Sequence, residues 1–131
     1  MIRETLLDKA KKDIAVAEAL YRQPEVDELF LDAISYHIQQ AVEKALKYQM
    51  EESGIHYDYE HDIQNLIDAA LDGDENIIVT DYIKDNTDML TNWESKTRYI
   101  TGYRVVKNRV DAAIKEARRF VDLVSQSANE K

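Results

Sequence analysis

The chain has 131 residues, which is enough for one domain with its own apolar core and leaves little room for a second domain. It contains no cysteine, which excludes disulfides, thiolate metal sites and a cysteine nucleophile. With 17 basic and 26 acidic residues, its net charge is −9, which disfavours general binding to the phosphate backbone of nucleic acids.

Apolar residues recur at three- and four-residue spacing, which predicts amphipathic helices along most of the chain. The first helix is predicted over 2–21. It ends before Pro24, because a proline pushes the preceding residue out of the helical region. The second helix is predicted from about Asp27 to about Glu52. Gly54 then supplies the left-handed exit that glycine adopts at low cost.

Two shorter helices are predicted in the middle of the chain. After a polar loop over 54–60, Asp58 is the predicted N-cap of a third helix, which closes at 72–73. A fourth helix is predicted over 75–93, with Trp93 at the end of its apolar stripe.

The segment 94–102 interrupts the pattern, and Thr101 is the predicted cap of the last helix. The buried stripe of that helix is predicted to comprise Val106, Val110, Ala113, Ile114, Ala117, Val121 and Val124. The pattern therefore predicts an all-α fold, a five-helix up-and-down antiparallel bundle over residues 1–124, followed by a frayed tail over 125–131.

No apolar run approaches the roughly 18 residues of a membrane-spanning helix. The first residues are charged and periodic, unlike the apolar core of a signal peptide. We therefore expect a cytoplasmic protein without a membrane partner.

Charge is unevenly distributed along the chain. Residues 51–94 hold thirteen acids and one base (net −12), whereas residues 96–119 hold eight bases and two acids (net +6). The favoured interpretation is a pair of complementary helix surfaces or a solvated face. The alternative is a basic site for a phosphate or an acidic partner.

The most specific stretch lies in the second helix, from Tyr36 to Lys47. His37, Gln40 and Lys44 follow one another at i, i+3 and i+7, so their side chains share one edge of the helix. Such an edge can hold a polar ligand or meet a partner helix. Its alanines and leucine are also what close helix packing requires.

The stretch resembles the second helix of the HEPN (higher eukaryote and prokaryote nucleotide-binding) domain, in which an aromatic residue and a histidine precede Gln-Ala-x-Glu-Lys-x-Leu-Lys. The resemblance continues at His61-Asp62-Ile63, where that family opens its third helix. It continues again at Thr97-Arg98-Tyr99, before the family's last helix. The matches run in the right order over nearly the whole chain.

The chain departs from the family at two places. Ile100 stands where the family has a proline, so the turn there is less rigid than in the family. Ribonucleases of the family carry an arginine followed four to six residues later by a histidine. Here Arg104 has no histidine after it, and none follows His61 anywhere. Metal-free RNA cleavage usually needs a base with a near-neutral pKa, which histidine supplies and arginine does not.

A second candidate site is the basic and aromatic cluster formed by Arg98, Tyr99, Tyr103, Arg104 and Lys107. Free amides at the start of the last helix lie beside these side chains in the predicted fold, and this combination attracts phosphate. The alternative is that Arg98 pairs with the acidic third or fourth helix and Tyr99 packs on the core.

The histidines also raise the question of a metal. His37 and His61 are predicted to lie too far apart along the second helix to share an ion. The cluster of His56, Asp58 and His61 lacks a specific ligand spacing. No metal is therefore expected, and His61 is expected to hydrogen-bond loop backbone or a neighbouring helix.

The resemblance implies a HEPN protein without catalytic residues that forms a homodimer, works beside a minimal nucleotidyltransferase and takes a nucleotide as its ligand. The alternative is an enzyme, an unconventional ribonuclease or toxin that uses His37 or His61 with Arg98 or Arg104. A third hypothesis is a helical protein with a purely structural role in an assembly.

Overall fold

The computed structural model describes residues 3–58, 60–99 and 101–130, with the backbone alone at 98 and 99. Within these residues the chain forms six helices and no strand. They are α1 (Leu6–Tyr21), α2 (Glu28–Glu52), α3 (Ile63–Gly73), α4 (Asp81–Asp85), α5 (Thr87–Tyr99) and α6 (Lys107–Asn129). The all-α prediction is confirmed, but six helices stand where five were expected.

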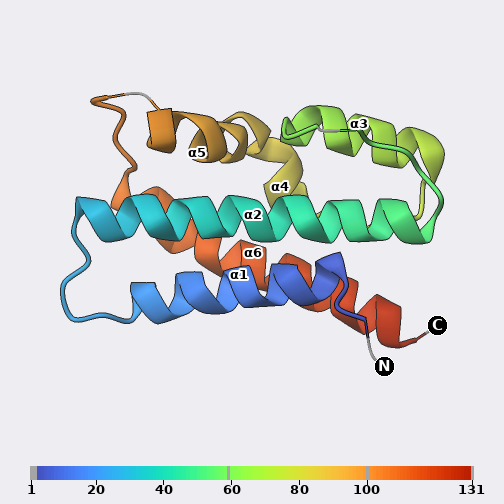
Figure 1. Cartoon of the computed structure of the whole chain (residues 1–131), viewed down its shortest axis with the longest axis horizontal. Coiled ribbons are helices and arrows are strands. Elements are labelled where there is room, and N and C mark those ends of the chain that lie inside the picture. Colours follow the sequence, from blue (N-terminus) through green and yellow to red (C-terminus); the bar gives the residue numbers. More distant parts are fainter. Residues whose placement is uncertain (1–2, 59, 100, 131) are drawn as a thin grey trace.

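The helix α2 is the central element of the bundle. It contacts α1, α3, α5 and α6, and its buried residues extend along its whole length. In Figure 1, α1 lies along one side of α2, α3 and α5 lie in line along the other, and α6 passes behind. Because α3 and α5 together match the length of α2, they act as one broken rod in a four-rod bundle.

The order of the helices is not strictly up-and-down. Asp74, which follows α3, accepts a hydrogen bond from Ser53 at the end of α2, while the amide of Ile63 at the start of α3 donates to Thr91 in the middle of α5. The helix α3 therefore runs in the same direction as α2 (Figure 1), because the segment between them first turns back along the bundle.

The predicted fourth helix is replaced by an extended segment and two helices. The side chain of Gln49 on α2 makes both hydrogen bonds of an amide to the backbone of Ile78, accepting from its nitrogen at 2.8 Å and donating to its oxygen at 3.0 Å. These bonds hold the chain extended before Thr80, which caps the short α4. The helix α5 then continues to Tyr99, through part of the segment in which an interruption was expected.

Four helix boundaries differ from their predicted positions. The first helix begins at Leu6, after the cap residue Thr5, rather than at residue 2. Asp62, rather than Asp58, caps α3 and accepts from the amide of Asn65 at 2.9 Å. Asp58 instead adopts a left-handed backbone in the preceding loop. Val106, rather than Thr101, precedes α6 and provides no side-chain cap. The same helix continues through Ser125 to Asn129, so residues 125–129 of the region expected to fray are helical.

The core lies between the rods, and the predicted stripes fill most of it. Trp93 and Phe120 are the largest fully buried side chains. Trp93 was predicted to be buried, whereas Phe120 was missed, and Val106 is half exposed rather than part of the stripe. No side-chain polar atom buried in the described residues lacks a hydrogen-bond partner.

Gly73, the last residue of α3, packs against the loop that follows α2. A Cβ atom placed on Gly73 would lie 2.7 Å from Cγ1 and 2.8 Å from Cδ1 of Ile55, closer than carbon atoms pack. We expect Gly73→Ala to lower the free energy of unfolding by about 1–2 kcal/mol, the usual cost of overpacking. Urea unfolding followed by circular dichroism measures this cost.

The matched control is a double-mutant cycle with Ile55→Ala. This substitution removes the atoms that clash, so the double variant should be more stable than the sum of the two single changes predicts. Additive effects would show that the two residues do not compete for the same space.

Candidate functional site

The helix edge predicted from the spacing of His37, Gln40 and Lys44 is part of the contact between α1 and α2. The Nδ1 atom of His37 lies 2.8 Å from Oδ1 of Asp13, and the Nζ atom of Lys44 lies 2.6 Å from Oδ2 of the same carboxylate. Asp13 projects from α1 and is 8% exposed. The Asp13 carboxylate therefore binds both His37 and Lys44, two of the three residues that were predicted to share one edge of α2.

The charge state of Asp13 follows from these contacts. Burial of the Asp13 carboxyl favours its neutral form, but the hydrogen bonds from His37 and Lys44 and the positive charge of Lys44 outweigh burial and lower its pKa. The contact therefore contains a negative carboxylate between two nitrogen groups, with the side chains of His37 and Lys44 about one quarter exposed.

A second carboxylate on α2 repeats this arrangement. Oε1 of Glu43 lies 3.1 Å from Nδ1 of His61, and Oε2 accepts a hydrogen bond from Nζ of Lys47 at 3.2 Å. Glu43 is 4% exposed, whereas the side chain of His61 is more than half exposed. Each of the two histidines is thus held by a buried carboxylate that also binds a lysine.

Gln40 belongs to this second group. Its Nε2 atom donates to Oε1 of Gln39 at 2.7 Å, and Nε2 of Gln39 donates to Oε1 of Glu43 at 3.1 Å. The edge predicted as one surface is therefore two polar groups. His37 and Lys44 face α1, and Gln40 connects through Gln39 and Glu43 to His61.

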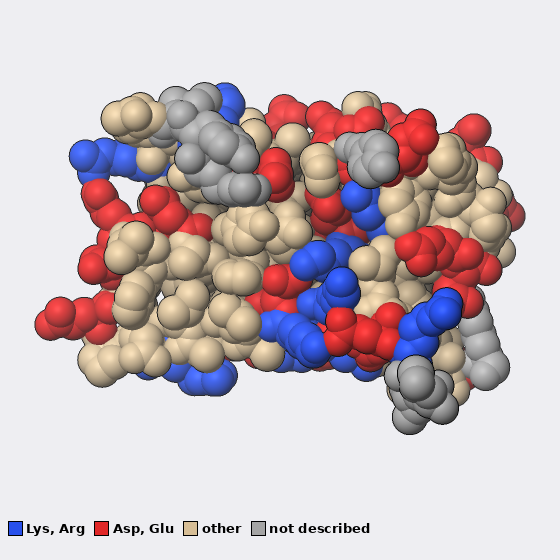
Figure 2. All heavy atoms as spheres, in the orientation of Figure 1, with Lys and Arg blue, Asp and Glu red and all other residues tan. Residues whose placement is uncertain are grey.

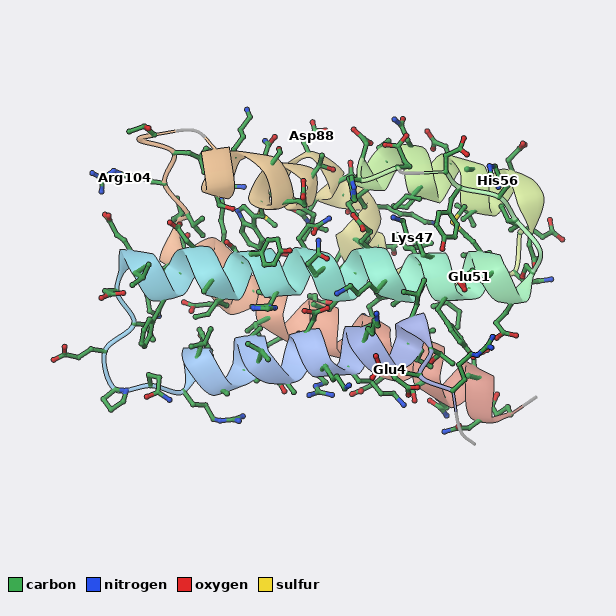
Figure 3. All side chains as sticks on the ribbon, viewed as in Figure 1. Glu4, Lys47, Glu51, His56, Asp88 and Arg104 are labelled. Carbon is green, nitrogen blue, oxygen red and sulfur yellow. The ribbon has the colours of Figure 1, made fainter. Side chains whose placement is uncertain are left out.

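The second predicted cluster is not assembled around one point by the residues described. The side chains of Arg98 and Tyr99 lie outside the described residues, and their backbone is part of α5. Arg104 forms an ion pair with Glu28 at the start of α2, and both side chains are about three quarters exposed. Figure 3 shows Arg104 at the end of the bundle away from His56 and Glu51.

Lys107 reaches α1 instead. Its Nζ atom lies 3.1 Å from Oδ1 of Asp111 and 5.7 Å from the centre of the Tyr21 ring. The hydroxyl of Tyr21 donates to the same carboxylate, and both contacts lower the pKa of Asp111. Lys107 therefore helps to join α6 to α1.

The described residues contain no group of three or more histidine and carboxylate side chains that could hold a metal ion. His56 contacts Asp58 at 2.6 Å, and both side chains are more than four fifths exposed. His61 binds Glu43 rather than this pair.

A shallow groove adjoins His37 between α2 and α5. It measures about 480 Å³ and is lined by Leu29, Asp32, Ala33, Tyr36, His37 and Thr97. The ring of His37 meets that of Tyr36 edge to face, with 5.4 Å between their centres. Because Asp13 holds Nδ1 of His37, the Nε2 nitrogen is the one left to bind or exchange a proton with a ligand.

A family model described as the HEPN domain matches residues 3–127. The chain belongs to the HEPN domain family. Searches of curated proteins and of solved structures returned no match. None of the helices in the described part of this HEPN chain combines the length and apolar character needed to cross a membrane.

The residue that the site depends on, Asp13, was not predicted as part of it. The sequence does mark its position, because Asp13 lies on the same buried stripe of α1 as Ala10, Ile14 and Ala17. A charged residue on a buried stripe needs a partner of opposite charge, so its position marks a tie to another helix.

We expect Asp13→Asn to lower the free energy of unfolding at pH 7 by about 2–3 kcal/mol, because it leaves Lys44 and His37 beside a neutral amide. The pKa of Asp13 is depressed in the folded chain. Its contribution is therefore complete above the unfolded pKa of about 4 and is lost as the pH falls through the lower folded value. The difference between wild type and variant should shrink toward pH 3.

Urea unfolding at pH 7 and pH 3 measures both effects, with Asp85→Asn as a control at an exposed aspartate. An equal loss for the two variants at pH 7 would contradict the proposed tie.

Proposed function

We propose that this HEPN protein is a binding module without catalytic activity. In this proposal it is a cytoplasmic homodimer that serves as the partner- and substrate-binding subunit of a minimal nucleotidyltransferase and takes a nucleotide as its small ligand. The observation that carries the proposal is the last helix, which follows Arg104 without a histidine. The usual acid–base residue of the ribonucleases in this family has no counterpart there.

The contacts of the remaining histidines support the same conclusion. His37 and His61 each bind a buried carboxylate whose other oxygen binds a lysine, and the two groups use different carboxylates. A salt-bridged carboxylate of this kind stabilises the junction of helices. Both histidines are therefore accounted for by the packing of α1, α2 and the loop before α3.

The start of α6 supports a nucleotide as the ligand. Val106 gives this helix no side-chain cap, so its first amides have no partner from that residue. Arg104 and Lys107 stand on either side of Val106, and both are exposed. Helix amides beside arginine and lysine form an arrangement that favours phosphate.

Thermal shift with ATP and related nucleotides tests the ligand. We expect a nucleotide to raise the melting temperature, and Arg104→Ala and Lys107→Ala each to reduce the shift severalfold. Arg119→Ala is the control, because Arg119 is an exposed arginine further along α6. A shift that all three variants retain would place the ligand elsewhere, and no shift with any nucleotide would remove the nucleotide from the proposal.

Co-expression tests the partner. The chain should co-purify with a minimal nucleotidyltransferase from the same genome, one that carries the Gly-Ser and paired-Asp signature. A transferase from an unrelated genome provides the control. Failure of both to bind would contradict the partner role.

A second function, RNA cleavage, is favoured by one observation. Asp13 binds Nδ1 of His37, as a carboxylate orients a general base, and His37 lines the groove together with Thr97. Incubation of the purified protein with total RNA decides between the two functions. We expect no cleavage, and cleavage that Arg98→Ala or His37→Ala abolishes would make the protein a ribonuclease.

A further inference from the structure

A groove between α1 and α6 is not used by the function proposed above. It measures about 400 Å³ and is lined by Glu18, Tyr21, Arg22, Ile114, Lys115 and Arg118. Apolar atoms form most of its surface, because a tyrosine ring, an isoleucine and the aliphatic stems of two arginines and a lysine surround it. The groove therefore offers an apolar hollow with charged groups on its rim.

The acid of the groove is already paired. Both oxygens of the Glu18 carboxylate accept hydrogen bonds from the guanidinium group of Arg118, one of them at 3.0 Å. These bonds lower the pKa of Glu18, so the carboxylate is charged and paired near neutral pH. A positively charged ligand would have to break this two-bond ion pair to reach Glu18.

Two bases of the groove have no such partner. Arg22 stands at the end of α1 and Lys115 lies in α6, so they line the groove from two different helices. Both are exposed, and neither side chain makes a hydrogen bond or a close ion pair within the described part of the chain. The charge that the fold leaves unused at this groove is therefore positive.

The charges along α6 limit the length of an anion that can lie there. Asp111, Lys115, Arg118 and Asp122 follow one another at i, i+4, i+7 and i+11, so they share one stripe of the helix. An acid thus stands at each end of the two bases, with about 17 Å between the two acids along the axis. A long polyanion would meet both acids, whereas a short acidic segment would fit between them.

The groove also lies away from the main acidic surface. Figure 2 shows acidic side chains gathered over α3, whereas basic side chains reach the edge of the molecule that α1 forms in Figure 1. An acidic partner that approaches this edge meets attraction at close range despite the negative net charge of the chain.

The shape of the groove favours a protein segment over a small molecule. Sites for small ligands enclose most of the surface of their ligand, which a shallow, open groove does not do. A protein segment needs to place only one apolar side chain in the hollow. Acids on either side of that residue can then pair with Arg22 and Lys115.

We propose that the groove docks an acidic segment of a partner protein, with one large apolar side chain against Tyr21 and Ile114 and acids beside Arg22 and Lys115. The proposal does not depend on the nucleotide site proposed above, because neither Arg104 nor Lys107 lines the groove. It also does not depend on a nucleotidyltransferase, since it specifies the chemistry of the bound segment and not the protein that carries it.

Selection from a displayed library of random short peptides, with the purified full chain as the target, tests the chemistry of the occupant. We expect the selected peptides to carry acids on both sides of a large apolar residue, because this pattern matches the two free bases and the hollow between them. Selected peptides without acids would overturn the proposal, and so would a library that yields no binder.

Fluorescence anisotropy with a labelled peptide from that selection tests the place of binding. Arg22→Glu combined with Lys115→Glu should raise the dissociation constant at least about tenfold, because it puts like charges beside the acids of the peptide. The control is Lys9→Glu combined with Lys84→Glu, which changes the net charge equally at two exposed lysines outside the groove. Equal weakening by the two double variants would show attraction by net charge alone and would overturn the proposed site.

Competition with octyl phosphate distinguishes a protein segment from a small amphiphilic anion. We expect octyl phosphate to displace the labelled peptide only far above the dissociation constant of the peptide, because its single head group cannot pair with both free bases through separate acids. Displacement at a concentration similar to that constant would assign the groove to a small ligand and overturn the proposal.

Discussion

The bundle depends on the pairing of two carboxylates that folding removes from water. Asp13 on α1 and Glu43 on α2 are each less than a tenth exposed. A buried carboxylate is costly unless it is paired and hydrogen-bonded, and each of these binds one histidine and one lysine. Because Asp13 takes both partners from α2, it also fixes how α1 and α2 are aligned along their lengths.

The second pairing fixes the loop that leads to α3. His61 precedes the cap residue Asp62, and its contact with Glu43 holds the start of α3 beside the middle of α2. The chain must therefore turn back after α2 before α3 can begin, which gives α3 the same direction as α2. Gly54, with its left-handed backbone, begins that turn. The polar contacts thus help to determine the topology as well as the stability.

The sequence predicted the long elements well because their patterns are local. The stripes of α1, α2 and α6 repeat over several turns, and the ends of α2 at Asp27 and Gly54 follow from capping chemistry. The prediction was wrong at 75–93, where Ile78 fits a helical stripe but is held extended by Gln49 from another helix. A hydrogen bond between residues far apart in the sequence cannot be predicted from the local spacing of apolar residues.

The same distinction applies to the candidate site. The spacing of His37 and Lys44 correctly placed them on one edge, because that relation is a property of a single helix. Their partner Asp13 is 24 residues from His37 in sequence, and only the packing of α1 on α2 brings it close. The two halves of the edge, one facing α1 and one facing the loop at His61, are likewise a consequence of the fold rather than of the pattern.

The ion pairs also show how the uneven charge of the chain is resolved. The basic stretch 96–119 could have been neutralised by the acidic stretch 51–94, which precedes it in sequence. The ion pairs of Arg104, Lys107 and Arg118 in fact use Glu28, Asp111, Glu18 and Asp122, which lie outside that acidic stretch. In the described residues, the bases therefore join α6 to α1 and α2 or bind acids of α6 itself.

Three acids of α3 and the loop after it, Asp68, Asp72 and Glu75, are exposed to solvent. Extended nucleic acid would meet that negative surface if it crossed the whole bundle. A compact phosphate at the start of α6 would avoid it, because Arg104 lies at the opposite end of α2 from the loop that carries His56 (Figure 3). In the function proposed above, this distribution of charge suits a small anionic ligand or a protein surface better than a long polynucleotide.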